Sequence, residues 1–309
     1  NEIRNRAMGR EFYGSKKGCA STCNGFELKN DLDFDTTGDG VVDENDEFWN
    51  DGLGWEPIGS GNSSAHLSIF NGNSRTIKNL TINRPNTNNV GLFGYIRQST
   101  LVGNVSLESV NVTGKKYVGG FAGVVNNSTL QTIYIDGQVQ GLEEVAGVIG
   151  SLEENSSLTK SSHIGAVTGQ DNIGGLVGYV YKSTISKVFH IGPVAGDDYV
   201  SGLVAEISDG NIEHAYSAGN VTGNDYVGGI AGTALFDYDA VSSQIKNVYS
   251  IATVTGNAEH VGALVGNVER TTITQAYWQT DAYSEESGMQ GIGDTQNDTS
   301  IALTKLELQ

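Results

Sequence analysis

The hydrophobic and polar positions along the chain are dominated by one repeated block. An aliphatic residue, two small residues, two apolar residues and a further small residue recur at residues 118–123, 145–150, 173–178, 200–205, 227–232 and 261–266. The first residues of successive blocks are 27, 28, 27, 27 and 34 positions apart. A second apolar column runs through Leu130, Leu158, Ile185, Ile212, Ile245 and Ile273. Two columns that agree on one period predict a repeat protein with a unit of about 27 residues.

The repeat unit contains short β-type runs and no helical periodicity. Each unit offers three such runs: the repeated block, a run such as residues 184–189, and a short run such as residues 219–223. Gly, Asn, Asp and Ser separate the runs, as expected for strands joined by tight turns. A slightly different copy at residues 90–94 precedes the others. We therefore predict an all-β fold, a parallel β-helix (solenoid) of about eight coils, because stacked coils bury one continuous apolar column.

The sequence predicts one solenoid domain over residues 1–309, capped at both ends. Residues 1–84 would hold an N-terminal cap and the opening coil, residues 85–280 the repeated coils, and residues 281–309 a C-terminal cap. Ile3, Ala7 and Met8 stand at helical spacing within residues 1–12, which favours an amphipathic lid. Residues 299–308 are the corresponding candidate at the far end. Caps are expected because an unpaired terminal coil is a template for aggregation.

Charge and cysteine content restrict the partners and the compartment. The formal net charge is −18, with 36 acidic and 18 basic residues. A surface this acidic repels nucleic acid and anionic lipid, so neither is an expected partner. No apolar stretch approaches the roughly 20 residues of a membrane helix, which argues against membrane insertion. Cys19 and Cys23 favour a small local disulfide in an exported protein over two free thiols.

The repeated motifs resemble a known family. V-G-G-L-V-G type blocks followed by T-I-x-N-x-Y and G-x-V-T-G are similar to the GLUG-motif repeat region of bacterial secreted and cell-surface proteins, including adhesin-like chains and immunoglobulin A protease precursors. The resemblance covers about residues 25–308. It implies a right-handed β-helix and an extracellular or cell-surface location. It implies little about activity, because such repeats serve as stalks beside many different domains.

The sharpest local motif is an acidic loop at residues 35–46. Oxygen donors stand at loop positions 1, 3, 5, 7, 9 and 12, with Gly40 at the sixth position, as Ca²⁺ requires. The spacing resembles a dockerin or EF-hand loop, although position 3 is Thr and position 12 is Asp in place of Glu. Both changes predict weak binding with a structural role; the alternative is an acidic surface turn. The predicted ligands are Asp35, Thr37, Asp39, Val41, Asp43 and Asp46.

A column of acidic residues precedes the repeated blocks and raises the possibility of an enzyme. It contains Glu143, Glu144, Asp171, Asp197, Asp198, Asp225 and Glu259. Polysaccharide lyases and hydrolases use paired carboxylates, but a catalytic pair should be a local exception and not a property of every coil. We interpret the column as a solvated ladder of turn residues, since Asp and Asn favour such turns for backbone reasons.

Two further ladders follow from the period. His163 and His190 are equivalent and should stack on neighbouring coils. Two His alone make a poor metal site, so we interpret them as a packed surface ladder. The aromatic column is either a ligand-stacking strip or, as we favour, packing between coils. It consists of Tyr134, Phe189, Tyr216, Tyr249 and Tyr277.

One repeat is about six residues longer than the others. The excess falls in residues 233–243, and solenoid insertions project as loops where binding residues concentrate. Phe236, Asp237, Tyr238 and Asp239 could stack on a sugar ring and hold its hydroxyls. The alternative, which we favour, is that the aromatic side chains fold back onto the coil.

These observations predict a non-catalytic, calcium-stabilised structural or adhesive module of a bacterial surface protein. Its expected partners are glycans or proteins on a host or neighbouring cell, with other copies of itself as a further option. Two alternatives remain: a carbohydrate-active β-helix enzyme, and a self-assembling subunit of an extracellular filament. The repetition of the acidic column argues against the enzyme, and the acidic surface opposes self-assembly unless cations screen it.

Overall fold

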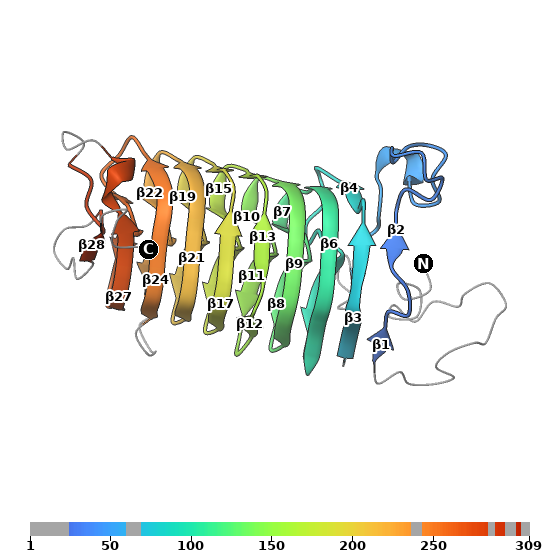
Figure 1. Cartoon of the computed structure of the whole chain (residues 1–309), viewed down its shortest axis with the longest axis horizontal. Coiled ribbons are helices and arrows are strands. Elements are labelled where there is room, and N and C mark those ends of the chain that lie inside the picture. The colour runs from blue at the N-terminus through green and yellow to red at the C-terminus, as the bar shows by residue number, and fades with distance from the viewer. Residues whose placement is uncertain (1–24, 60–68, 236–242, 284–287, 294–300, 304–309) are drawn as a thin grey trace.

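The chain winds into a parallel β-solenoid whose strands stack side by side along the long axis (Figure 1). The structure is a computed structural model that describes residues 25–59, 69–235, 243–283, 288–293 and 301–303. Within these residues there is no α-helix, only the single-turn 3₁₀ segments η1 (Asn50–Gly52) and η2 (Thr280–Ala282). The expected all-β class is therefore confirmed.

The broadest face of the solenoid is a 15-stranded sheet, called here the broad sheet. Its main strands run in the order β1 (Phe26–Glu27), β3 (Ile69–Lys78), β6 (Leu101–Thr113), β9 (Thr129–Gln140), β12 (Ser157–Thr159), β17 (Thr184–Ile191), β21 (Asn211–Thr222), β24 (Gln244–Thr255), β27 (Thr272–Gln279) and β28 (Ile301–Leu303). Shorter strands extend it: β2 (Leu32–Asp33), β4 (Thr81–Asn83), β13 (Ser162–Ile164), β14 (Val167–Thr168) and β18 (Val194–Ala195).

Two narrower sheets complete each turn. The six-stranded sheet contains β7 (Lys116–Gly119), β10 (Glu143–Ala146), β15 (Asp171–Gly174), β19 (Asp198–Ser201), β22 (Asp225–Gly228) and β25 (Val261–Gly262). The seven-stranded sheet contains β5 (Phe93–Arg97), β8 (Ala122–Asn126), β11 (Ile149–Glu153), β16 (Val177–Tyr181), β20 (Val204–Ser208), β23 (Ala231–Leu235) and β26 (Val265–Val268). One strand of this sheet per turn gives about seven turns, close to the eight expected.

The register between coils follows the two apolar columns of the sequence. Val118 pairs with Val145, and the pairing continues through Ile173, Val200, Val227 and Val261. The second column pairs in the same way from Leu130 to Ile273. Equivalent apolar residues stack on one another because a register shift of one residue would turn the buried side chains of a strand toward solvent.

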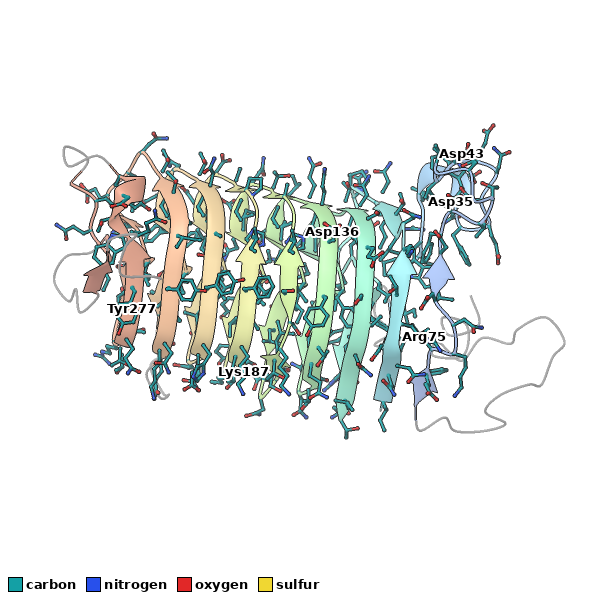
Figure 2. All side chains as sticks on the ribbon, in the orientation of Figure 1. Asp35, Asp43, Arg75, Asp136, Lys187 and Tyr277 are labelled. Carbon is teal, nitrogen blue, oxygen red and sulfur yellow. The ribbon has the colours of Figure 1, made fainter. Side chains whose placement is uncertain are left out.

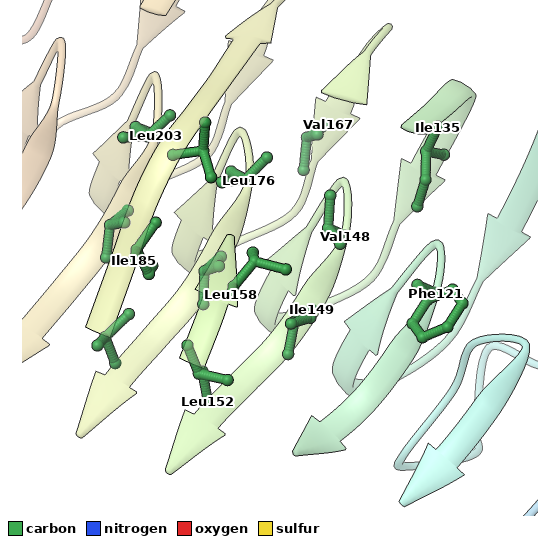
Figure 3. Packing of buried hydrophobic residues seen from close by; sticks show 14 of the residues in the cluster. Phe121, Ile135, Val148, Ile149, Leu152, Leu158, Val167, Leu176, Ile185 and Leu203 are labelled. Carbon is green, nitrogen blue, oxygen red and sulfur yellow. The ribbon is translucent and has the colours of Figure 1, made fainter. Parts of the chain in front are cut away.

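The core is a continuous apolar column between the three sheets (Figure 3). Figure 3 shows Leu158 and Ile185 of the broad sheet directed toward the strands of the other sheets. At the N-terminal end the core is aromatic, because the ring of Phe93 packs against those of Phe70 and Phe121, with centroids 5.2 Å apart in each pair. Each coil thus buries its apolar residues within itself and against the coils next to it, as expected of a solenoid.

Residues with positive φ inside the long strands change which side chains point into the core and which point outward. Lys187 in β17 has φ 56°, and both Ser186 and Lys187 face outward. Val188 and His190 then face the core, while Phe189 between them is turned outward. Thr132, His214, Asn247 and Gln275 also have positive φ in β9, β21, β24 and β27. This left-handed residue recurs from coil to coil and decides which side chains reach solvent.

The predicted end caps are described only in part. Residues 1–12 lie outside the described residues. Within residues 299–308, β28 (Ile301–Leu303) adds a parallel strand to β27, and the rest lies outside them. At the N-terminal end, β1 pairs with β3 and so continues the broad sheet.

Candidate functional site

The acidic loop at residues 35–46 is organised by carboxylates that accept backbone N–H groups. Asp46 is buried; its Oδ1 accepts from the amides of Thr36 and Thr37 at 2.5 and 3.0 Å, and its Oδ2 accepts from the amide of Asp43 at 2.9 Å. These bonds, first that from Asp43, hold the pKa of Asp46 below its usual value despite its burial. Asp35 accepts from the amides of Gly38 and Gly40 at 2.7 and 2.8 Å.

The loop does not gather its predicted calcium ligands around one point. Asp39 accepts from the amide of Val41 at 3.0 Å, and the Val41 side chain is exposed. Asp43 accepts from Asn45. Among the described residues, no group of three His, Cys, Asp or Glu side chains is placed to hold a metal ion. Calcium binding by this loop stays a prediction.

A second group of polar side chains lies where the six-stranded and seven-stranded sheets adjoin. Its members on the six-stranded sheet share one position, the second residue of each strand, and all have φ between 52° and 58°: Tyr117, Glu144, Asn172, Tyr199 and Tyr226. Tyr occupies this position in three of the five strands, and Glu144 is the one acidic residue among the five. The neighbouring column on the seven-stranded sheet includes Ser151, Tyr179 and Glu206.

Glu144 is the most perturbed acid of this group. Lys116 Nζ lies 3.4 Å from its Oε1, and its Oε2 is buried without a hydrogen-bond partner. Burial raises the pKa of Glu144 to about 7, against the opposing effect of Lys116. Glu206, which accepts from Asn172 Nδ2 at 3.0 Å, also has a pKa raised by burial. A carboxyl group with a pKa near 7 can both donate and accept a proton at neutral pH.

The acidic column therefore divides into two kinds of residue. Glu143, Asp171, Asp198 and Asp225 lie in register on successive coils. Burial, and then the negative charge of Asp198, raise the pKa of Asp171. Glu144, by contrast, has only 13% of its side chain exposed, so its interpretation as part of a solvated ladder was wrong. Its replacement of Tyr in the repeat was the sequence signal that could have singled it out.

His163 and His190 stack as expected, but inside the core. Their rings are parallel within 10° with centroids 5.1 Å apart, and neither side chain is exposed. The expected surface ladder was wrong because the left-handed residue Lys187 shifts the alternation and turns His190 inward. Burial lowers the pKa of His163 to about 4; burial and the neighbouring His163 lower that of His190 to about 3.

The two His rings take part in three hydrogen-bond contacts, but two neutral rings carry only two N–H groups. The Nδ1 atoms are 3.1 Å apart, and each Nε2 lies 3.2 Å from a carbonyl oxygen, that of Gly137 or Gly192. A neutral imidazole carries one N–H, so two rings donate two hydrogen bonds into three contacts. One added proton would complete the set, but burial opposes the charge.

The aromatic column on the outside of the broad sheet forms a stack. Phe189, Tyr216 and Tyr249 have centroids 4.9 Å apart and planes within 8° of parallel. Tyr277 lies further along the same face (Figure 2). Ser162 separates Tyr134 from Phe189 in the register. The faces of the stacked rings cover one another, which favours packing over ligand stacking as the role of these rings.

Two predicted sites lie outside the described residues. These are the insertion residues Phe236, Asp237, Tyr238 and Asp239, and the Cys19–Cys23 pair. The flanking strands β23 and β24 continue the solenoid on both sides of the insertion. No helix in the described residues is long and apolar enough to cross a membrane.

Comparison with known proteins gives partial matches and no family. No family model matches the chain. Halomucin of Haloquadratum walsbyi is 38% identical over 141 residues, which is 45% of this chain and 2% of halomucin. An immunoglobulin A1 protease of Streptococcus sanguinis is 33% identical over 94 residues, 28% of this chain and 5% of the protease. The chain thus corresponds to a small part of each of these relatives.

A solved structure is similar in outline. A candidate immunoglobulin A1 protease from Bacteroides ovatus aligns with 92% of this chain and 78% of its own chain, at 18% identity and a TM-score of 0.48.

Proposed function

We propose that this chain is a rigid, non-catalytic β-helical module of an extracellular or cell-surface protein, with glycans or proteins of a host or neighbouring cell as its partners. The observation that carries the proposal is the unbroken register of the apolar columns from Val118 to Val261. It supports a rod that extends and presents side chains at a regular spacing of about 4.8 Å per coil. The small share of each relative that the chain matches supports a module within a longer protein.

A carbohydrate-active enzyme is the second candidate, and Glu144 is the observation in its favour. Its buried oxygen without a partner and its pKa of about 7 are properties of a general acid. Glu206 is the neighbouring acid with a raised pKa, but it accepts a hydrogen bond from Asn172 and so differs from Glu144. For this reason we place binding ahead of catalysis.

Incubation with a panel of soluble polysaccharides distinguishes the two candidates. The binding module should be retained on immobilised polysaccharide and should release no new reducing or unsaturated chain ends. New chain ends that disappear with Glu144→Gln would overturn the non-catalytic assignment in favour of the enzyme. Asp136→Asn, on the outer face of the broad sheet (Figure 2), is the control for a change of one carboxylate.

We also propose that Ca²⁺ stabilises the module through the loop at residues 35–46. The spacing of its oxygen donors and the burial of Asp35 and Asp46 support this role. A bound ion stabilises the folded state by mass action, so chelation should lower the melting temperature at millimolar calcium. Asp39→Ala should abolish the difference, whereas the control Asp136→Ala should retain it. Identical melting curves of the native chain with and without chelator would contradict calcium binding.

A further inference from the structure

A cleft of about 680 Å³ lies between the acidic loop and the adjoining coils. Figure 1 shows the loop at the N-terminal end of the solenoid, beside β4. Gly40 and Val41 of the loop form one wall together with Trp49, which follows the loop in the sequence. Side chains of β4, β6 and β9 form the other. This cleft includes none of the residues singled out as perturbed acids, and the calcium motif contributes only Gly40, Val41 and Val42 to it.

The loop wall is anchored through aromatic residues. Phe48 packs against Phe34 and Trp55, with ring centroids 5.0 and 5.7 Å apart. The next residue, Trp49, lines the cleft, and its ring covers Gly52, where an added Cβ would lie 3.6 Å from Cζ2. Trp49 is half-buried, whereas Trp55 and Trp278 are buried. An indole ring is thus held at the cleft with part of its surface accessible.

The solenoid wall is a ladder of neutral hydrogen-bonding side chains. Asn83, Thr113 and Gln140 occupy one row in register on successive coils, and Asn111 lies in the adjacent row. Asn83, Asn111 and Gln140 are exposed, and their side-chain amide groups make no hydrogen bond within the described part of the chain. Each amide offers two N–H donors and a carbonyl acceptor, the pattern that matches neighbouring hydroxyl groups.

Charge and backbone pairing restrict what can occupy the cleft. Every residue that lines it is uncharged, in a chain with a net charge of −18. The cleft therefore has no ion-pairing group for a charged polymer. A peptide cannot add as a strand to β4, because β4 pairs with β6 on one side and the chain at Leu53 and Trp55 hydrogen-bonds to it on the other.

We infer that this cleft binds a neutral polysaccharide chain, with its sugar hydroxyls on the amide ladder and a sugar face on Trp49. The inference rests on the proposed adhesive function and deepens it by naming the site and the ligand class. The rows repeat once per coil, about 4.8 Å apart, so successive sugars of one chain meet equivalent side chains. An aromatic ring with a few placed polar groups is typical of a small-ligand site.

Binding is measured by retention on, and titration with, the neutral polymers xyloglucan, mannan and dextran, with polygalacturonate as the charged polymer. At least one neutral polymer should bind and perturb tryptophan fluorescence, because Trp49 is the most accessible of the 3 Trp residues. Trp49→Ala should weaken binding about tenfold or more, since aromatic anchors dominate such contacts. Trp49→Phe should restore part of the affinity, and Gln140→Ala should weaken it independently.

Thr222→Ala is the matched control, because Thr222 is exposed in the same row of the broad sheet several coils away. It should bind as the native chain does. Retention of a neutral polymer that is unaffected by Trp49→Ala and Gln140→Ala would overturn the cleft and leave the adhesive function standing. Retention of polygalacturonate alone, unchanged in both variants, would also overturn the cleft and leave the adhesive function standing. Failure to retain any polymer would overturn the cleft together with glycan adhesion.

Discussion

Gly165→Ala is expected to lower the free energy of unfolding by more than about 3 kcal/mol, because the substitution adds both steric overlap and backbone strain. Gly165 has φ 144°, and an added Cβ would lie 1.7 Å from the carbonyl oxygen of Gly137 on the preceding coil. A Cβ added to Gly192 would likewise lie 2.0 Å from the carbonyl oxygen of Gly165. The stacked backbones are held at the spacing of a parallel sheet, so neither coil can retreat without loss of its hydrogen bonds.

Gly288→Ala is the matched control for this prediction. Gly288 also has a positive φ, 62°, but nothing lies within 4 Å of an added Cβ. Its substitution should cost only the left-handed conformation, about 1 to 2 kcal/mol. Denaturant midpoints of the two variants and the native chain provide the measurement. Equal midpoints for the two variants would contradict the claim that close stacking, and not φ alone, requires glycine at position 165.

Acidification is expected to destabilise the fold through the buried His pair. The folded-state pKa values of about 4 and about 3 lie below the ordinary value of 6.5, so the unfolded chain binds more protons at acid pH. The stability associated with neutral His is present above about pH 6.5 and is lost as the pH falls toward 4 and 3. Linkage gives an upper bound of about 4 kcal/mol for the loss between pH 8 and pH 5.

Two features of the structure act against this loss. The proton shared between the Nδ1 atoms would complete the third hydrogen-bond contact, so the observed loss should lie below the bound. The pKa of Glu144 is raised to about 7, so protonation of this carboxyl group stabilises the folded state as the pH falls over the same range. The informative quantity is therefore the difference in pH dependence between the native chain and a variant that lacks the pair.

The double variant His163→Phe/His190→Phe retains two stacked rings and cannot titrate. Its unfolding free energy, measured by denaturant at several pH values, should fall less between pH 8 and pH 5 than that of the native chain. His260, which contacts Asp225 at 3.0 Å and is partly exposed, provides the control variant His260→Phe. If the double variant and the native chain lose stability in parallel, the buried pair does not control the acid response.

Much of the fold could be predicted from the sequence because the repeat period gives the register between the strands of successive coils. A column such as Leu130, Leu158 and Ile185 can recur every 27 or 28 residues only if successive coils align it. The equivalent pairing of His163 with His190 followed from the same period and is confirmed. The loop at residues 35–46 was singled out as a calcium motif by the spacing of its oxygen donors. The structure shows Asp46 bonded to Thr36 and Thr37, and calcium binding stays a prediction.

The sequence by itself therefore determined the repeat, the β-class and the stacking partners within the repeated columns, since these depend only on the period. Only the tertiary structure decided which side chains face inward. The left-handed residue within each long strand, Lys187 among them, interrupts the alternation without any change in the period. His190 is therefore buried, and Phe189 is turned outward and only partly buried. The burial of Glu144 and the cleft beside Trp49 were likewise beyond the sequence, because both arise where segments distant in the chain meet, and burial depends on what covers a residue.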